Sequence, residues 1–144
     1  MTELTPDEQA LAEIKANPFY YAVALMESSC NVNAENKTST AKGIFQLILQ
    51  TRKNLGVSNW RSPAQQLQAF KRLLKRNKMV FKTEDPEKLY AAHYLGEPTY
   101  KKVVENLPLT PKQEDIVSYY VYKVAPKFRK ILEKTMKEAS NRGA

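Results

Sequence analysis

Residues 24–46, ALMESSCNVNAENKTSTAKGIFQ, join the end of an uncharged helix to a polar loop. Residues 16–26 contain no lysine, arginine, aspartate or glutamate, and Glu27 is the first charged side chain after them. A helix that is apolar on all sides belongs in the interior of a protein. The pattern therefore predicts an interior helix over 18–29 that carries one carboxylate at its C-terminal end.

The position of Glu27 favours a raised pKa. Burial disfavours the charged form of a carboxylate, and so does the negative end of the helix dipole. A carboxyl group that stays protonated near neutral pH can donate its proton to a leaving oxygen, as a general acid does. The alternative is a glutamate at a helix end that points to solvent or pairs with a lysine. The local pattern makes Glu27 a candidate general acid.

Capping residues and prolines also mark several helix starts outside this segment. TPDE (5–8), SPAQ (62–65) and TPKQ (110–113) each place a capping hydroxyl before a proline at N1 and a Glu or Gln at N3. Asp85 and Pro86 open a further helix in the same way. We expect helices near 6–16, 18–29, 41–55, 63–78, 86–95, 97–106 and 111–138, the last interrupted at Pro126. The sequence predicts a single all-α domain over 1–144, with room for a short hairpin within 30–40.

Composition sets outer limits on the function. The 144 residues suit one domain, and 23 basic against 15 acidic residues leave a net charge of +8, which favours an anionic partner. The single cysteine, Cys30, allows no internal disulfide. No apolar run of 18 residues is present, and the first twenty residues have no basic segment of the kind that begins a secretory signal.

Four sequence elements resemble one known family. They are ESSCNVNA (27–34), TAKGIFQL (40–47) followed by Thr51, AAHYLG (91–96) and SYYVYKV (118–124). In this order they are similar to the motifs of the lytic transglycosylases with a goose-lysozyme-like fold, whose usual forms are E-S-x-F-x-P-x-A, G-A-x-G-L-M-Q-L-M-P-x-T, A-Y-N-x-G and a late tyrosine motif. The resemblance implies a lysozyme-like helical domain that acts on peptidoglycan, with Glu27 as the catalytic acid.

The resemblance also implies which residues contact the glycan: Ser28, Gly43, Phe45, Gln46, His93, Tyr94 and Tyr120. Several have a plainer alternative. Ser28 fits a hydroxyl that caps the helix C-terminus, and Phe45 fits the core. Gly43 suits the close approach of either a sugar or a neighbouring helix. By helical spacing Gln46 lies on an ordinary polar face with Lys42, Gln50 and Lys53.

Departures from the family pattern are also present. Cys30 stands where phenylalanine is usual, Val32 and Leu49 stand where prolines are usual, and Thr40 stands where glycine is usual. His93 and Tyr94 replace a Tyr-Asn pair, so a tyrosine role does not carry over to His93. The lone histidine is also compatible with a packed, hydrogen-bonded position.

The reaction depends on whether a second carboxylate takes part. Most glycosidases use two. Glu35 is the only acid between Glu27 and Glu84, and it lies in a polar loop that should be solvated. Goose-type hydrolases carry aspartates 13 and 24 residues after the acid, where this chain has Thr40 and Thr51. A lone acid fits a transglycosylase, in which the 6-hydroxyl of N-acetylmuramic acid attacks its own anomeric carbon and leaves a 1,6-anhydro ring. A hydrolytic muramidase is the close alternative, and the sequence implies neither metal nor cofactor.

Residues 71–82, KRLLKRNKMVFK, carry six basic residues and no acid. On a helix, Phe70, Leu73 and Leu74 would face the core while the basic residues form a solvated basic face. This face could bind anionic envelope polymers. A basic helical module that binds nucleic acid is the distant alternative, although no helix-turn-helix, zinc or RNP signature is present and we expect no nucleic-acid partner.

The expected partner is the glycan strand of peptidoglycan, and the protein is expected to be a monomer. A wall-degrading enzyme without a signal peptide suggests a phage product that acts on the host wall, either as a released endolysin or as a virion-associated enzyme. A bacterial enzyme exported by another route and a domain of a longer chain remain alternatives.

Overall fold

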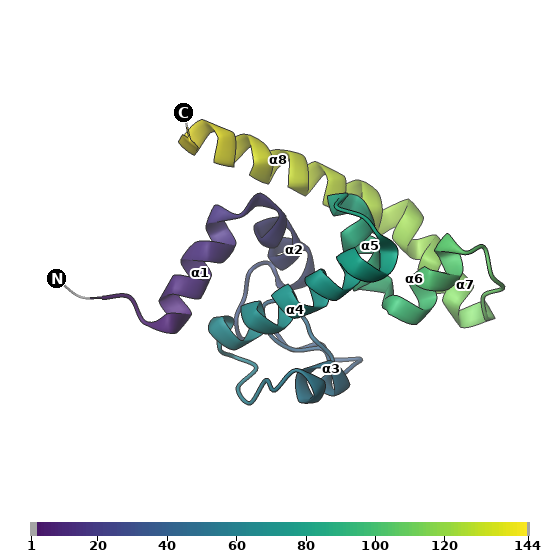
Figure 1. Cartoon of the computed structure of the whole chain (residues 1–144), viewed down its shortest axis with the longest axis horizontal. Helices are drawn as coiled ribbons and strands as arrows, with labels where there is room; N and C mark the ends of the chain where they lie inside the picture. Colours follow the sequence, from purple (N-terminus) through teal and green to yellow (C-terminus); the bar gives the residue numbers. More distant parts are fainter. Residues whose placement is uncertain (1–2, 144) are drawn as a thin grey trace. The chain divides into compact units, whose positions relative to one another are not determined.

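The computed structural model of the chain describes residues 3–143, and the regular secondary structure of these residues is helical, with no strand (Figure 1). The helices are α1 (Pro6–Ala16), α2 (Pro18–Ser28), α3 (Leu49–Asn54), α4 (Pro63–Phe81), α5 (Pro86–Leu95), α6 (Glu97–Val104), α7 (Pro111–Tyr119), the π-helix η1 (Tyr120–Val124) and α8 (Ala125–Gly143). The all-α prediction is confirmed. Within the described residues, no helix is long and apolar enough to cross a membrane.

The chain divides into two compact units. Unit 1 contains the residues up to Arg72 and those from Ile131 onward, whereas unit 2 is Leu73–Lys130. The boundaries fall inside α4 and α8. The expectation of a single domain over 1–144 stays a prediction.

Unit 1 is built on the pair α1 and α2, which are joined at Asn17 (Figure 1). Asn17 ends α1 and also caps α2, because its side-chain oxygen accepts a hydrogen bond from the Tyr20 amide at 3.0 Å. The C-terminal part of α8 packs here too, since the buried Thr135 hydroxyl donates to the Pro18 carbonyl at 2.9 Å. The aromatic centre of this unit is Phe70, whose ring stacks on Phe45 at 4.2 Å.

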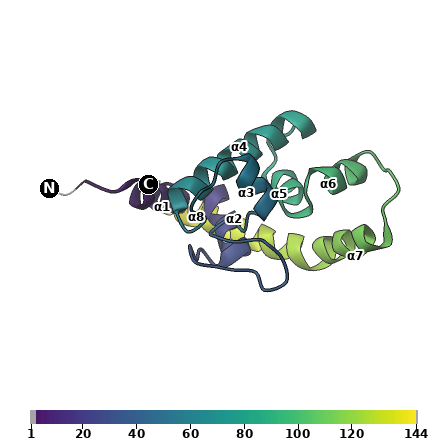
Figure 2. The same cartoon turned by 90° about the horizontal axis from the view of Figure 1, so that it is seen from below.

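Unit 2 contains α5, α6 and α7, with the loop of residues 105–110 joining α6 to α7 (Figure 2). Its core is largely aromatic. Tyr90 is buried and stacks on Phe128 at 4.2 Å, and Phe81 packs edge-on against Tyr100 at 4.8 Å.

The predicted helix starts are mostly confirmed. Thr5 and Thr110 form complete capping boxes with Glu8 and Gln113, and the Asp85 carboxylate accepts from the Lys88 amide. At α4 the reciprocal bond is not made, so the prediction there was half wrong. Ser62 Oγ accepts from the Gln65 amide at 3.2 Å, but the Gln65 side-chain oxygen instead accepts from the amides of residues 58 and 59.

The predicted helix over 41–55 is wrong in its first half, because only Leu49–Asn54 is helical. Residues 42–47 form a tight turn instead, closed by antiparallel bridge contacts between Lys42 and Leu47. Gly43 has φ +88° and Gln46 has φ +53°, and neither value fits a right-handed helix. A further bridge joins Glu35 to Lys42, so the short β-like feature begins within the predicted 30–40 and extends beyond it, to Leu47.

The helix predicted over 111–138 is interrupted just before Pro126, as expected. The interruption is the π-helix η1, in which the Ala125 amide donates to the Tyr120 carbonyl five residues earlier. Proline has no amide hydrogen and its ring displaces the carbonyl four residues before it, so the register changes here. Other helix ends shift as well, since α2 ends at Ser28, α4 extends to Phe81, α6 ends at Val104 and α8 extends to Gly143.

Candidate active site

Helix α2 carries Glu27 in its last turn, as the sequence predicted. Ala22, Val23 and Ala24 are fully buried, while Glu27 is half-buried. The last turn contains no basic residue, and Ser29 ends the helix in the left-handed conformation. Glu27 is therefore a carboxylate at the negative end of an interior helix of unit 1.

Ser28 connects the end of α2 to the turn of residues 42–47. Its hydroxyl oxygen lies 2.7 Å from the Ile44 carbonyl oxygen and 3.2 Å from that of Ala24, and it accepts from the Asn31 amide at 3.1 Å. The Ser28 hydroxyl thus links the end of α2 to the turn, which is close to the helix-capping role that the sequence offered as an alternative. These contacts hold Ser28, the residue after Glu27, in a defined position.

The turn Gly43–Gln46 is held by its own backbone and by neighbouring segments. The Gly43 amide donates to the Ala34 carbonyl at 2.8 Å, and the Gln46 amide donates to the Gly43 carbonyl at 3.0 Å. The Gln46 side-chain Nε2 adds bonds to the carbonyls of Gly43 (2.9 Å) and Ala34 (3.2 Å). The prediction that Gln46 lies on a helical polar face is wrong, because its half-buried side chain holds the turn together.

Gly43 is required because of its neighbours in the protein. A Cβ placed on Gly43 would lie 2.3 Å from Gln66 Nε2 and 2.7 Å from the Trp60 carbonyl oxygen. Of the two alternatives drawn from the sequence, the close approach of a neighbouring helix is the one seen, since Gln66 belongs to α4. Phe45 is likewise in the core, with its side chain fully buried against Phe70.

Two residues that support the turn were missed from the sequence. Gln66 is fully buried, and its side-chain oxygen accepts from the Phe45 amide at 3.1 Å while its Nε2 donates to the Lys42 carbonyl at 3.0 Å. Gln66 precedes Phe70 and Leu74 by four and eight residues, so a polar residue on an apolar stripe was the available signal.

The second missed residue is Arg52 of α3. Its side chain is buried, and one guanidinium nitrogen donates to the carbonyls of Thr40, at 2.7 Å, and Leu47. Burial lowers the pKa of this guanidinium below its usual range, although an arginine remains charged at neutral pH. Arg52 therefore joins the start and the end of the segment that contains the turn.

Glu35 lies in a solvated loop, as predicted. Its side chain is 53% exposed and forms an ion pair with Lys42 at 3.3 Å. Lys42 also lies 5.2 Å from the centre of the Trp60 ring, where the positive charge can interact with the π face. Glu35 is thus an exposed, paired carboxylate.

In unit 2 the other site candidates form one aromatic cluster. The rings of His93, Tyr94 and Tyr120 lie 6.2–6.3 Å from that of Tyr90, and the Tyr94 and Tyr120 rings are 5.2 Å apart. Burial raises the pKa of the Tyr120 phenol well above its usual range, so it stays protonated and can donate a hydrogen bond at neutral pH. The fold brings these three candidates together from α5 and η1.

The three tyrosines of residues 118–124 differ in burial. Tyr120 is buried, whereas Tyr119 and Tyr122 are 57% and 76% exposed. The periodicity alone did not decide which of the three would be in the core. Among residues 3–143 there is no group of three or more His, Cys, Asp or Glu side chains that could hold a metal ion.

The fold and these contacts define an all-helical protein with a half-buried glutamate beside a tightly bonded turn. The model of the Transglycosylase SLT domain family matches residues 7–116, which is more than half of the chain. The chain therefore belongs to this family, which gives it a lysozyme-like fold and indicates transglycosylase activity on peptidoglycan. Comparison with curated proteins and with solved structures found no match.

The matched residues include Glu27, the turn that follows it, and His93 and Tyr94 of the aromatic cluster. Tyr120 lies beyond the matched range, so the late tyrosine motif has only the sequence resemblance to support it.

Proposed function

We propose that the protein is a lytic transglycosylase that cleaves the β-1,4 bond between N-acetylmuramic acid and N-acetylglucosamine. Glu27 donates its proton to the glycosidic oxygen as the bond to the anomeric carbon breaks. The 6-hydroxyl of the same muramic acid residue attacks that carbon and returns its proton to Glu27. The products are a free 4-hydroxyl and a 1,6-anhydro end, and no water is consumed.

One observation carries the choice of a transglycosylase over a hydrolase. Between Glu27 and Glu84 the sequence has no acid except Glu35, whose carboxylate is exposed and ion-paired with Lys42. A base that activates water needs a carboxylate held beside the scissile bond. An intramolecular hydroxyl needs only one residue that acts as acid and then as base, with the substrate N-acetyl group stabilising the oxocarbenium-like centre.

The remaining candidates take two kinds of role in this proposal. Ser28, Gly43, Phe45 and Gln46 contact other parts of the protein and support the position of Glu27. In unit 2, the aromatic cluster of His93, Tyr94 and Tyr120 supplies ring faces, a phenol donor and an imidazole of the kind that contacts sugars.

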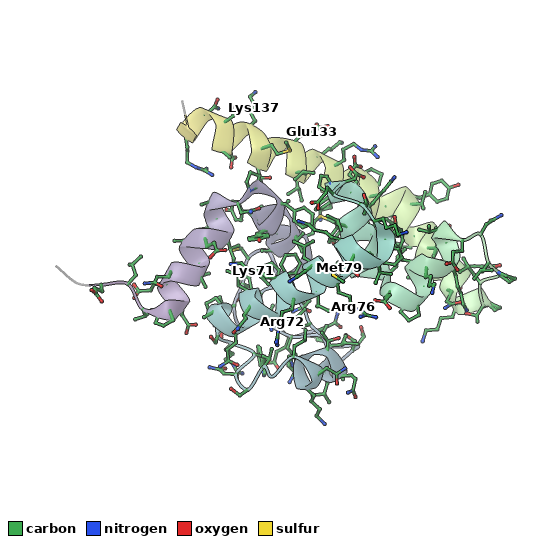
Figure 3. All side chains as sticks on the ribbon, in the orientation of Figure 1. Lys71, Arg72, Arg76, Met79, Glu133 and Lys137 are labelled. Carbon is green, nitrogen blue, oxygen red and sulfur yellow. The ribbon has the colours of Figure 1, made fainter. Side chains whose placement is uncertain are left out.

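The basic face of α4 is exposed as predicted, with Lys71, Arg72 and Arg76 on its solvent side (Figure 3). Part of its charge is paired, because Lys71 contacts Glu13 and Arg76 contacts Glu97 at 2.7 Å. Lys78 pairs with Glu84 in the same way, at 3.1 Å. This pairing lowers the local positive charge and gives the nucleic-acid alternative less support than the sequence did. Attraction to anionic envelope polymers stays a proposal.

The test is mass spectrometry of the fragments released from purified peptidoglycan. We expect products one water lighter than reducing-end muropeptides, and we expect Glu27→Gln to release none. Glu35→Gln is the matched control, since it removes the same charge from a solvated position. Reducing ends in the wild-type digest would replace the proposal with a hydrolytic muramidase. Release by Glu27→Gln at the wild-type rate would remove Glu27 from the reaction.

The place of action stays a prediction. An enzyme of phage origin that acts on the host wall, whether released or carried in the virion, is a proposal that rests on the sequence alone. So is the monomeric state.

A further inference from the structure

Gln66 is a fully buried glutamine whose side-chain amide is bonded to main chain at both ends. Its oxygen accepts from the Phe45 amide at 3.1 Å, and its nitrogen donates to the Lys42 carbonyl at 3.0 Å. These two backbone groups flank the residues Gly43 and Ile44. Burying a polar side chain costs free energy unless its hydrogen bonds are made. The buried Gln66 side chain is therefore stable only while the backbone of residues 42–45 keeps the position in which it forms these two bonds.

The bonds of Gln66 connect to Glu27 through Ile44 and Ser28. Ile44 lies between the two points that Gln66 holds, and its carbonyl accepts from the Ser28 hydroxyl at 2.7 Å. Ser28 follows Glu27 directly at the end of α2. If the turn moved away, the Ser28 hydroxyl would keep only its local acceptor, the Ala24 carbonyl at 3.2 Å. The C-terminal end of α2 would then lose its hydrogen bond to the segment Gly43–Gln46.

The requirement at this position is for a donor and an acceptor on one neutral planar group. A carboxylate offers no donor to the Lys42 carbonyl, and an apolar side chain offers neither bond. Gly43 belongs to the same arrangement, because any Cβ there would lie 2.3 Å from Gln66 Nε2. The two residues, 23 positions apart in the sequence, therefore depend on each other.

We propose that Gln66 is a positioning residue for Glu27, acting through the turn Gly43–Gln46 and Ser28. The inference rests on the proposed function, since it assumes that Glu27 is the catalytic acid. Gln66 is enclosed by protein and does not contact substrate. Its loss should therefore lower kcat while KM changes little, because small displacements of a catalytic group are costly to the chemical step.

The first variant is Gln66→Met, which keeps the side-chain length and removes both bonds. We expect kcat for peptidoglycan cleavage to fall about 10- to 100-fold with KM within about threefold. Gln65→Met is the matched control. Gln65 is the preceding residue on α4, and its side-chain oxygen accepts from the amides of Ser58 and Asn59 rather than from the turn. It should keep kcat within about threefold of wild type.

The second variant is Gln66→Glu, which tests the hydrogen-bond pattern itself. A protonated carboxyl group can accept from the Phe45 amide and donate to the Lys42 carbonyl, whereas an ionised one cannot donate. Activity relative to wild type should therefore be highest at low pH and fall as pH rises through roughly 5–8, the range expected for a buried carboxyl group. Far-UV circular dichroism at each pH confirms that the same fraction of protein is folded.

The outcomes separate the two hypotheses. A Gln66→Met enzyme with wild-type kcat, or a Gln66→Glu ratio that does not change with pH, would overturn the positioning role and leave the proposed function intact. A folded wild-type protein that cleaves no peptidoglycan would overturn both. Should Gln66→Met fail to fold, Gln66→Glu at low pH still decides the matter, because the protonated side chain can restore both bonds.

Discussion

Replacing Gly43 with alanine tests whether the turn after Glu27 is as closely packed as the structure shows. The new Cβ would lie 2.3 Å from Gln66 Nε2, 2.6 Å from Gln66 Cδ and 2.7 Å from the Trp60 carbonyl oxygen. Distances this short are not tolerated, and the backbone oxygen cannot rotate away as a side chain can. The φ of +88° adds strain for any residue with a side chain.

The expected loss of stability follows from three contributions. The positive φ costs roughly 1–2 kcal/mol for a non-glycine residue. Overpacking a filled site adds roughly 1–3 kcal/mol. The lower entropy of the unfolded alanine chain returns roughly 0.4–1 kcal/mol. Gly43→Ala should therefore lower the free energy of unfolding by about 1–5 kcal/mol, a large part of the total for a chain of this size.

Gly56→Ala is the matched control. Gly56 also has a positive φ, +71°, but a Cβ there would meet nothing within 4 Å. Its cost should be limited to the backbone strain, about 1 kcal/mol after the entropy gain. The difference between the two variants then measures the steric contribution alone.

The assay is urea unfolding followed by far-UV circular dichroism and by the fluorescence of Trp60, the only tryptophan. Coincident transitions establish two-state unfolding. Gly43→Ala combined with Gln66→Ala should be less destabilised than the sum of the single variants, since the second change removes two of the three close atoms. Equal urea midpoints for Gly43→Ala and Gly56→Ala would refute the close packing inferred for this turn.

Three further predictions concern individual charged or reactive groups. Glu35→Gln should cleave peptidoglycan within about twofold of the wild-type rate, since an exposed ion pair contributes little, and a loss of tenfold or more would favour the hydrolytic mechanism. The pKa of Glu97 lies below its usual range because Arg76 donates two hydrogen bonds to it. The ion pair therefore stabilises the fold at pH values above the pKa of Glu97 in the unfolded chain, about 4.3. This stabilisation is lost as the pH falls through the lower pKa of Glu97 in the folded protein. The difference in urea midpoint between wild type and Glu97→Gln should shrink from pH 7 to pH 3, and a constant difference would contradict this. Burial raises the pKa of the Cys30 thiol, so less thiolate is present at a given pH. At pH 8 an aromatic disulfide reagent should react with Cys30 several-fold more slowly in the folded chain than in urea, and equal rates would show a fully solvated thiol.

Local chemistry accounts for the parts of the fold that were predicted well. The helices that begin at Pro6, Pro86 and Pro111 start where a capping side chain precedes a proline, and those contacts involve residues only three apart. The interruption before Pro126 has an equally local cause. Such features need no knowledge of the rest of the chain.

The turn Gly43–Gln46 was not predicted, because its stability comes from distant residues. The sequence predicted a helix over 41–55, and Gly43 was the one local signal against it. The turn is more stable than a helix here because Gln66, Arg52 and Ser28 form hydrogen bonds with the backbone of this segment. Those bonds form only once α2, α3 and the start of α4 have come together.

By itself, then, the sequence determined the helical class, most of the helix starts, the family resemblance and the choice of Glu27 as candidate acid. The tertiary structure alone decided that Phe45 is core, that Gly43 faces Gln66, and that Tyr120 rather than Tyr119 or Tyr122 is buried. The physical reason is the distance along the sequence between the residues that interact. Caps and helix breaks involve neighbours in the chain, whereas packing and buried hydrogen bonds depend on residues that only the complete fold brings into contact.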